Sequence, residues 1–250
     1  MASVRDLGRL LEIEGENPAR DHIAEALSQF LSEQRARLAP KTFANYEYAI
    51  ELLQHSLNGY ACQSLDRAET KLFDRLYNAN GDEHREFCEI FGPEHILANV
   101  EEFLGYFMVR KVIAGKESLR AVGTATRKLA AWLAEKGYVN TKDAEEAAER
   151  GSEAARNLPK AQELASLLHE FAEDQERGDG PNEIEDHFTV TRVELGKIWI
   201  EGMLDGREVG PIEVSADISR RCKVRWSISG VVGRVGKQWR IVEAWNVYPG

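Results

Sequence analysis

The chain has few of the features that mark secreted and membrane proteins. Its 250 residues include only three cysteines, Cys62, Cys88 and Cys222, which lie far apart and are odd in number. Such usage is typical of reduced thiols rather than of a disulfide framework. No run approaches the roughly 18–20 apolar residues that span a bilayer. Acidic residues interrupt the apolar stretch at the N-terminus, which is unlike a signal peptide. These absences predict a cytoplasmic chain with no membrane partner.

The sequence also lacks the residue groupings of enzymes and metal proteins. No Ser/His/Asp or Cys/His grouping has local sequence context. His84 and Cys88 are spaced as i,i+4 and His95 follows a Gly-Pro turn, but a zinc site needs a fourth ligand and usually tighter cysteine spacing. The glycine-rich run at 230–236 lacks the Lys-Ser/Thr ending of a phosphate loop and is typical of a β-hairpin turn. We therefore expect no catalytic residue, no metal and no cofactor, and a protein that is not an enzyme.

Charge is distributed unevenly along the chain. The net charge is −10, yet residues 141–186 alone hold 14 acidic and five basic residues. Residues 103–139 hold seven basic residues and two acidic ones. Phosphate binding requires clustered lysine and arginine. Because the acidity is concentrated in one connecting stretch, the net charge does not exclude a nucleic-acid partner.

Hydrophobic periodicity predicts an α+β protein with two modules. Apolar residues at helical spacing predict helices at 3–14, from Asn17-Pro18 through Leu31, and at 40–59, 65–77, 94–113, 119–137, 142–150 and 159–177. The period then changes to alternation, which predicts strands at 187–195, 197–204, 207–214, 223–232 and 238–248, with a helical turn at 216–221. The expected division is a helical domain at 1–177, a linker at 178–186 and a small β domain at 187–250.

The five short strands predict a closed barrel, because closure removes exposed strand edges. Both an OB-like and an SH3-like barrel fit, and the position of the helical turn favours the OB order. The module carries Trp199, Trp226, Trp239 and Trp245, and most of them are expected in its core because each buries a large apolar area.

Two helical phrases in the first module share a pattern. APKTFANYEYAIELLQHSLNGY begins at Ala39, with Thr42 near the helix start and Tyr46 four residues later. KESLRAVGTATRKLAAWLAEKGYV repeats the theme with Ser118 and Thr124 and ends at Val139. In order and pattern the phrases resemble the SAM-like core-binding domain of tyrosine recombinases (the phage integrase family), a helical clamp that holds DNA. The resemblance covers about residues 39–139 and departs from the family's pattern at 61–95, where an additional helical segment sits.

The resemblance implies that the starts of these helices approach the DNA backbone, where free amides, hydroxyls and cations bind phosphate. The implied DNA-binding residues are Lys41, Thr42, Asn45, Arg110, Lys111, Lys116, Arg120, Arg127 and Lys128. The alternative for these charges is a solvated helix face, with Arg110 and Lys111 favouring a helix C-terminus.

Recombinase catalysis is excluded because no histidine of the chain begins the required motif. The family needs a His-x-x-Arg motif and a tyrosine nucleophile around the scissile phosphate. The residues three positions after the six histidines are Glu25, Asn58, Phe87, Ala98, Ala172 and Val190, and none is arginine. The C-terminal module is also too short to hold the catalytic domain.

The C-terminal module offers a second candidate surface, where an exposed tryptophan beside cations would stack on bases or grip a peptide. Its residues are Arg225, Arg234, Lys237, Trp239 and Arg240. The leading hypothesis is a non-catalytic DNA-binding accessory or regulatory protein. The alternative is a protein–protein interaction or scaffold module that keeps the recombinase-like fold for its shape, and an enzyme of unfamiliar type is the third hypothesis.

Overall fold

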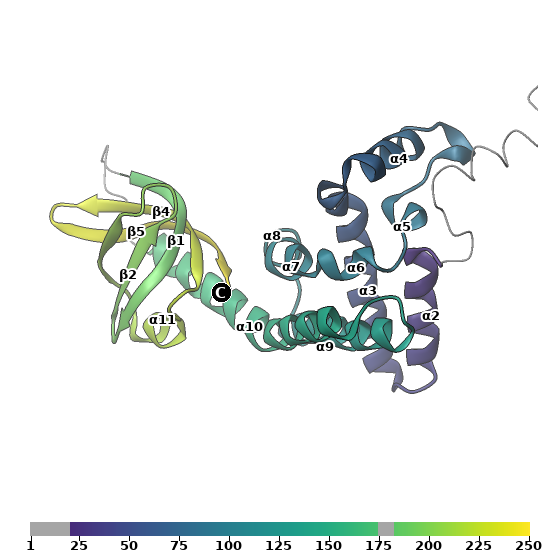
Figure 1. The fold of residues 1–250 in the computed structure, drawn as a ribbon. Helices are drawn as coiled ribbons and strands as arrows, with labels where there is room; N and C mark the ends of the chain where they lie inside the picture. The colour runs from purple at the N-terminus through teal and green to yellow at the C-terminus, as the bar shows by residue number, and fades with distance from the viewer. Residues whose placement is uncertain (1–20, 175–182) are drawn as a thin grey trace, which may run out of the picture.

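The computed structural model describes residues 21–174 and 183–250, a helical part followed by a five-stranded mixed sheet (Figure 1). The fold is therefore α+β, as the sequence predicts. The helix expected at 3–14 and the helix start at Asn17-Pro18 lie outside the described residues. Within the described ranges, no helix combines the length and the apolar character that a membrane span requires.

The helical part packs around a core of aromatic and aliphatic side chains. Its elements up to residue 90 are α2 (Ile23–Arg35), α3 (Pro40–Tyr60), η1 (Ala61–Ser64), α4 (Arg67–Tyr77), η2 (Gly81–Glu83) and α5 (Phe87–Ile90). Those that follow are α6 (His95–Ala98), α7 (Val100–Glu102), η3 (Phe103–Phe107), α8 (Met108–Arg110), α9 (Lys116–Glu135) and α10 (Thr141–Glu173). Phe30 of α2 is fully buried and its ring meets that of Trp132 in α9 edge-on, with centroids 5.6 Å apart. Burying a phenylalanine contributes about 1.5–3 kcal/mol to stability, so such contacts hold these helices around one core.

The single helix expected over 94–113 is instead divided into α6, α7, the π-helical turn η3 and α8. Asn99 follows α6, and its side-chain amide donates to the His95 carbonyl oxygen at 2.9 Å. That bond competes with the regular backbone pattern and explains the break. The helix expected at 40–59 is confirmed as α3, which ends one residue beyond Gly59. Gly59 lies within α3, whose last turn is closed by the Ala61 amide donating to the Leu57 carbonyl oxygen.

The two helices expected at 142–150 and 159–177 form one continuous helix, α10, with Pro159 inside it. Proline in a helix interior costs about 3 kcal/mol because it removes a backbone hydrogen bond and crowds the preceding turn. Pro159 is buried, and α10 packs against α9 before it and against the sheet after it. Tertiary packing on both sides of Pro159 therefore outweighs its local cost.

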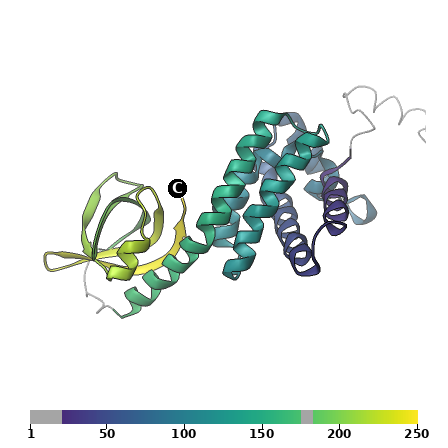
Figure 2. The same cartoon turned by 90° about the horizontal axis from the view of Figure 1, so that it is seen from below.

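Helices α9 and α10 pack with their backbones in contact (Figure 2). A Cβ atom placed on Gly123 would lie 2.3 Å from the Ala155 amide nitrogen. One placed on Gly151 would lie 2.7 Å from the Arg127 amide nitrogen. No side chain fits at either position unless the helices move apart, so glycine is required at both.

The C-terminal module is a sheet of five strands that pair in a closed order. Its elements are β1 (Glu183–Glu194), β2 (Lys197–Gly202), β3 (Glu208–Glu213), α11 (Ala216–Arg221), β4 (Ser227–Val235) and β5 (Gln238–Tyr248). The pairings run β1-β2-β3-β5-β4 and return to β1, with β3 and β5 parallel and all other pairs antiparallel. The five strands and the helical turn at 216–221 are confirmed, and β5 has the expected bounds. Residues 183–186, expected in the linker, are the first residues of β1.

Helix α10 takes part in both cores. Leu158 packs in the helical core, whereas Ala161, Leu164 and Leu168 pack with the inward side chains of the sheet, such as Phe188. Figures 1 and 2 show α10 running from the helix bundle to the sheet as one rod. The two modules are therefore joined by a shared helix.

Candidate nucleic-acid interface and junction pocket

The structure brings the first turns of α3 and α9 side by side. Lys41 of α3 forms an ion pair with Glu117 of α9, with Nζ and Oε1 2.9 Å apart. Neither helix has a side-chain cap: the residues before them are Ala39 and Gly115. The first amides of a helix have no partner within it and carry partial positive charge. Two uncapped helix starts therefore face solvent next to each other.

The predicted cations of α9 continue this surface. Arg120, Arg127 and Lys128 are exposed, and none forms an ion pair within the described part of the chain. Burial raises the pKa of Tyr46 in α3, and the positive charges of Arg127 and Arg37 oppose that rise. Arg37 was not among the predicted residues, because it precedes the first helical phrase, yet the structure places it by this face. We call Arg37, Lys41, Thr42, Asn45, Arg120, Arg127 and Lys128 the α3/α9 face.

Three predicted cations differ from this group. Lys116 pairs with Glu163 at 2.9 Å and so contacts α10, whereas Lys41, also ion-paired, joins the starts of α3 and α9. Arg110 lies on α8, where its guanidinium is 5.5 Å from the centre of the Tyr106 ring. Lys111 follows it, exposed, at the end of α8. Arg110 also lines the junction between the helical part and the sheet.

A second basic and aromatic group surrounds the turn between β4 and β5. Trp239 is half-buried, and the guanidinium of Arg234 lies 5.8 Å from its ring centre. Arg207 lies 5.6 Å from the same ring and comes from the turn before β3. Lys237 and Arg240 flank the tryptophan in the chain. We call these five residues the Trp239 cluster; Arg207 joins it only through the pairing of β3 with β5, which the sequence does not reveal.

Arg225, predicted with this cluster, lies elsewhere. It precedes β4, whereas Arg234 is near the other end of that strand. Arg225 has a positive φ of 73° and its amide donates to the Val190 carbonyl oxygen. It lies in the turn that links α11 to β4 and is separated from the Trp239 cluster by the length of β4.

The expectation that most tryptophans of the module are core residues is wrong. Only Trp226 is buried, while Trp199 and Trp239 are half-buried and Trp245 is 43% exposed. Smaller β-branched side chains, such as Ile198, fill the interior of the sheet. Because these aliphatic side chains and Trp226 already fill the interior, the other three indole rings lie toward the surface.

A third group of cations was not predicted. Lys223, which follows α11, donates to Asn157 Oδ1 of α10 at 3.1 Å. Partial burial lowers the pKa of Lys223, and the positive charges of Lys160 and Arg156 lower it further. Arg156 and Lys160 are spaced i,i+4, which is the only sign of this group in the sequence.

The residues considered for a metal site have other partners. His84 Nδ1 lies 2.6 Å from the Tyr77 carbonyl oxygen, and the amide of Cys88 donates to Asn58 Oδ1 at 3.0 Å. Across residues 21–174 and 183–250 no group of three or more His, Cys, Asp or Glu side chains could hold a metal ion.

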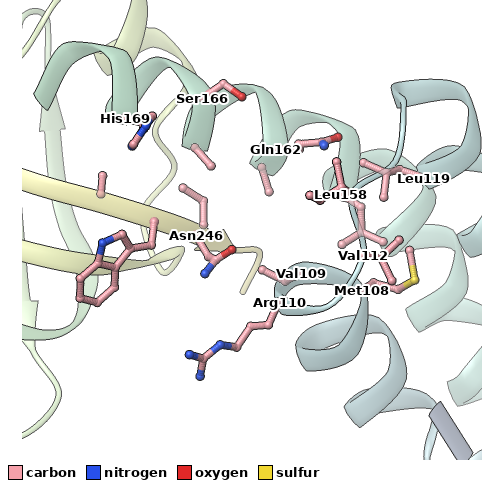
Figure 3. Close-up of a pocket in the computed structure, with 16 residues that line it drawn as sticks. Met108, Val109, Arg110, Val112, Leu119, Leu158, Gln162, Ser166, His169 and Asn246 are labelled. Carbon is pink, nitrogen blue, oxygen red and sulfur yellow. The ribbon is translucent and has the colours of Figure 1, made fainter. Parts of the chain in front are cut away.

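A pocket of about 520 Å³ lies where the helical part meets the sheet (Figure 3). Its walls come from α8 and the turn after it, from α9, from the second half of α10 and from β5. Val112, Leu119, Leu158, Ala161 and Val247 supply apolar surface. Arg110, Gln162, Ser166, His169 and Asn246 supply polar groups (Figure 3). The sequence contains no sign of this pocket, because its walls come from segments far apart in the chain.

Comparisons of the chain with protein-family models, with curated proteins and with solved structures find no match.

Proposed function

We propose that the chain is a non-catalytic DNA-binding protein that holds duplex DNA on the α3/α9 face. The observation that carries the proposal is that two uncapped helix starts lie side by side and that the unpaired cations Arg120, Arg127 and Lys128 follow on α9. Free amides at helix starts bind phosphate oxygens, and arginine and lysine add charge and release counterions from DNA. These contacts go to the backbone, so the proposed binding has little sequence preference.

The proposal extends to the origin of the helical part. Residues 39–139 would be related to the core-binding domain of tyrosine recombinases, as the two phrases in the sequence suggest. The side-by-side starts of α3 and α9 support this relation, since they are the parts that the resemblance assigns to DNA. The role that fits such a chain is that of an accessory or regulatory protein.

We further propose that the C-terminal sheet is an OB-like barrel. Its closed order, its parallel β3–β5 pair and the position of α11 between β3 and β4 support this choice over an SH3-like barrel. OB-folds bind oligonucleotides through a strand face and through loops that include the β4–β5 loop. The Trp239 cluster lies at that turn, and an indole beside cations suits stacking on an unpaired base.

The test is binding of a labelled 20-base-pair duplex and a 20-nucleotide single strand, measured by fluorescence anisotropy at about 50 and 200 mM salt. We expect the R120A/R127A/K128A variant to bind the duplex at least tenfold more weakly and to show a smaller salt dependence. The matched control is R67A/K71A/R75A, which removes three exposed cations from one face of α4. No affinity for DNA, affinity without salt dependence, or equal losses in both variants would contradict the proposal.

A second candidate function is favoured by the acidity of α10. Asp143, Glu145, Glu146, Glu149 and Glu153 are exposed on its first half. Such a surface repels DNA and suits a basic protein partner. If the chain binds no DNA but retains a protein partner after nuclease treatment, and E145Q/E146Q/E149Q abolishes that retention, the interaction module is the better description.

A further inference from the structure

We infer that the pocket between the helical part and the sheet binds a small amphipathic anion, a molecule with an apolar body and one carboxylate or sulfonate group. The inference concerns a different surface from the α3/α9 face and does not depend on DNA binding. It rests on the shape of the pocket, the chemistry of its walls and the unmet bonding capacity of its polar groups (Figure 3).

The volume and the walls suit an apolar body. A cavity of about 520 Å³ falls within the range of roughly 300–1,000 Å³ that is typical of small-molecule sites. Leu119 and Leu158 line the pocket and are buried, and Ala161 and Ala165 of α10 leave space along that wall because their side chains are small. Ile113, at the rim, is 97% exposed, and a bound apolar molecule would shield it from water.

The charge of the walls selects an anion. Arg110 carries the fixed positive charge, and none of the described residues that line the pocket is acidic. Arg110 has no ion pair within the described ranges. Its contact with the Tyr106 ring orients it beside the pocket without neutralising it. Tyr106 itself lies in the π-helical turn η3, a distortion that is frequent at functional sites.

Three further side chains are available to a ligand. The side-chain amides of Gln162 and Asn246 and the hydroxyl of Ser166 form no hydrogen bond within the described part of the chain. Asn246 and Arg110 are on the same side of the pocket, opposite Ser166 and His169 of α10 (Figure 3). A charged oxygen at the Arg110–Asn246 side would receive N–H donors from both, and charge-assisted bonds of this kind are the stronger class.

Because the pocket lies between the two modules, a bound ligand would contact both of them. Arg110 belongs to the helical part and Asn246 to the sheet, while Ala165 lies on the helix that both share. A ligand that contacts all three would stabilise the two modules in one arrangement. Anything that binds only the folded chain raises its unfolding temperature through mass action.

The test uses two fluorescent probes with similar apolar bodies. 1-Anilinonaphthalene-8-sulfonate carries a negative charge, whereas N-phenyl-1-naphthylamine is neutral. We expect the full chain to bind one equivalent of the sulfonate, with a saturable rise in fluorescence, a raised unfolding temperature and displacement by decanoate.

Two variants test separately how the charge of Arg110 and the space of the cavity contribute to binding. R110A should weaken binding of the sulfonate about tenfold, equivalent to about 1.4 kcal/mol, and change binding of the neutral probe less than twofold. A165W should fill the cavity and abolish binding of both probes. The control R67A removes an exposed cation from α4 and should change neither probe's affinity. Binding that does not saturate, R110A binding the sulfonate like wild type, or A165W retaining both probes would overturn the inference. Arg110 is exposed, so R110A tests it even if A165W fails to fold.

Discussion

The two halves of α10 pack against their neighbours in different ways. Up to Leu158, small residues such as Gly151 let the helix touch the backbone of α9 directly. From Ala161 onward, leucines insert into the sheet and complete its core. Enlarging a side chain in the first half is therefore expected to destabilise the fold, and so is truncating a buried leucine in the second half. One helix thus joins two cores that respond to opposite kinds of substitution.

The largest expected effect is at the sheet end of α10. Leu164 is fully buried, so L164A should lower the free energy of unfolding by about 2–5 kcal/mol through lost burial and the cavity left behind. Urea unfolding checks the value. The control L167A truncates a half-buried neighbour and should cost less.

Thiol labelling of L164A shows whether the two cores open separately. Burial raises the pKa of both Cys88, in the helical core, and Cys222, in the sheet core, to about 12. At pH 8 few of these thiols are thiolates, and only thiolates react readily. In L164A the labelling of Cys222 should accelerate while Cys88 stays protected. Equal acceleration of both would show that α10 unites the cores into one cooperative unit.

An intermediate effect is expected where α10 touches α9. G151A adds a methyl group whose carbon would lie 2.7 Å from the Arg127 amide nitrogen, and such overpacking costs about 1–3 kcal/mol. Thermal unfolding measures the loss. The matched control is G59A in α3, where the added carbon meets nothing within 4 Å and stability should rise by about 0.5–1 kcal/mol. A stabilised G151A would mean that the two helices separate readily.

The smallest effect is expected at the joint between the halves. P159A restores a backbone N–H donor and removes the cost of about 3 kcal/mol that proline imposes on a helix interior. It also loses buried contacts and raises the conformational entropy of the unfolded chain, both of which lower stability. We expect a net gain of about 1 kcal/mol in the free energy of unfolding, measured by urea titration.

The control for that substitution is P40A, at the first position of α3, where proline suits the helix start and its removal should not stabilise. A destabilised P159A would indicate that the proline fits a bend that the two cores require.

Much of the fold was predictable where local signals agree with tertiary packing. Pro40 marks the start of α3. The break expected between the strands at 197–204 and 207–214 holds Gly206, which has a φ of 64°. The bounds of β5 and α11 were predicted because alternation and turn residues enclose them. Predictions failed at 94–113 and at Pro159. At the first, a side-chain hydrogen bond breaks the pattern; at the second, packing overrides propensity.

The candidate sites were less predictable. The sequence indicated Lys41 and Arg120 as cations near helix starts, but it could not show that these starts are neighbours. Arg207 and Trp239 come together through a parallel strand pair that has no local signal. The pocket beside Arg110 was not predicted at all, because four separate segments form its walls.

The sequence by itself determined the α+β class, the order of most elements and the uneven distribution of charge. These properties depend on periodicity, turn residues and composition, which act over a few residues at a time. Tertiary structure alone decided that α10 is unbroken, that Gly123 and Gly151 let helices touch, and that a pocket opens between the modules. Those features depend on contacts between residues distant in the chain, and their energies exceed the local preferences that oppose them.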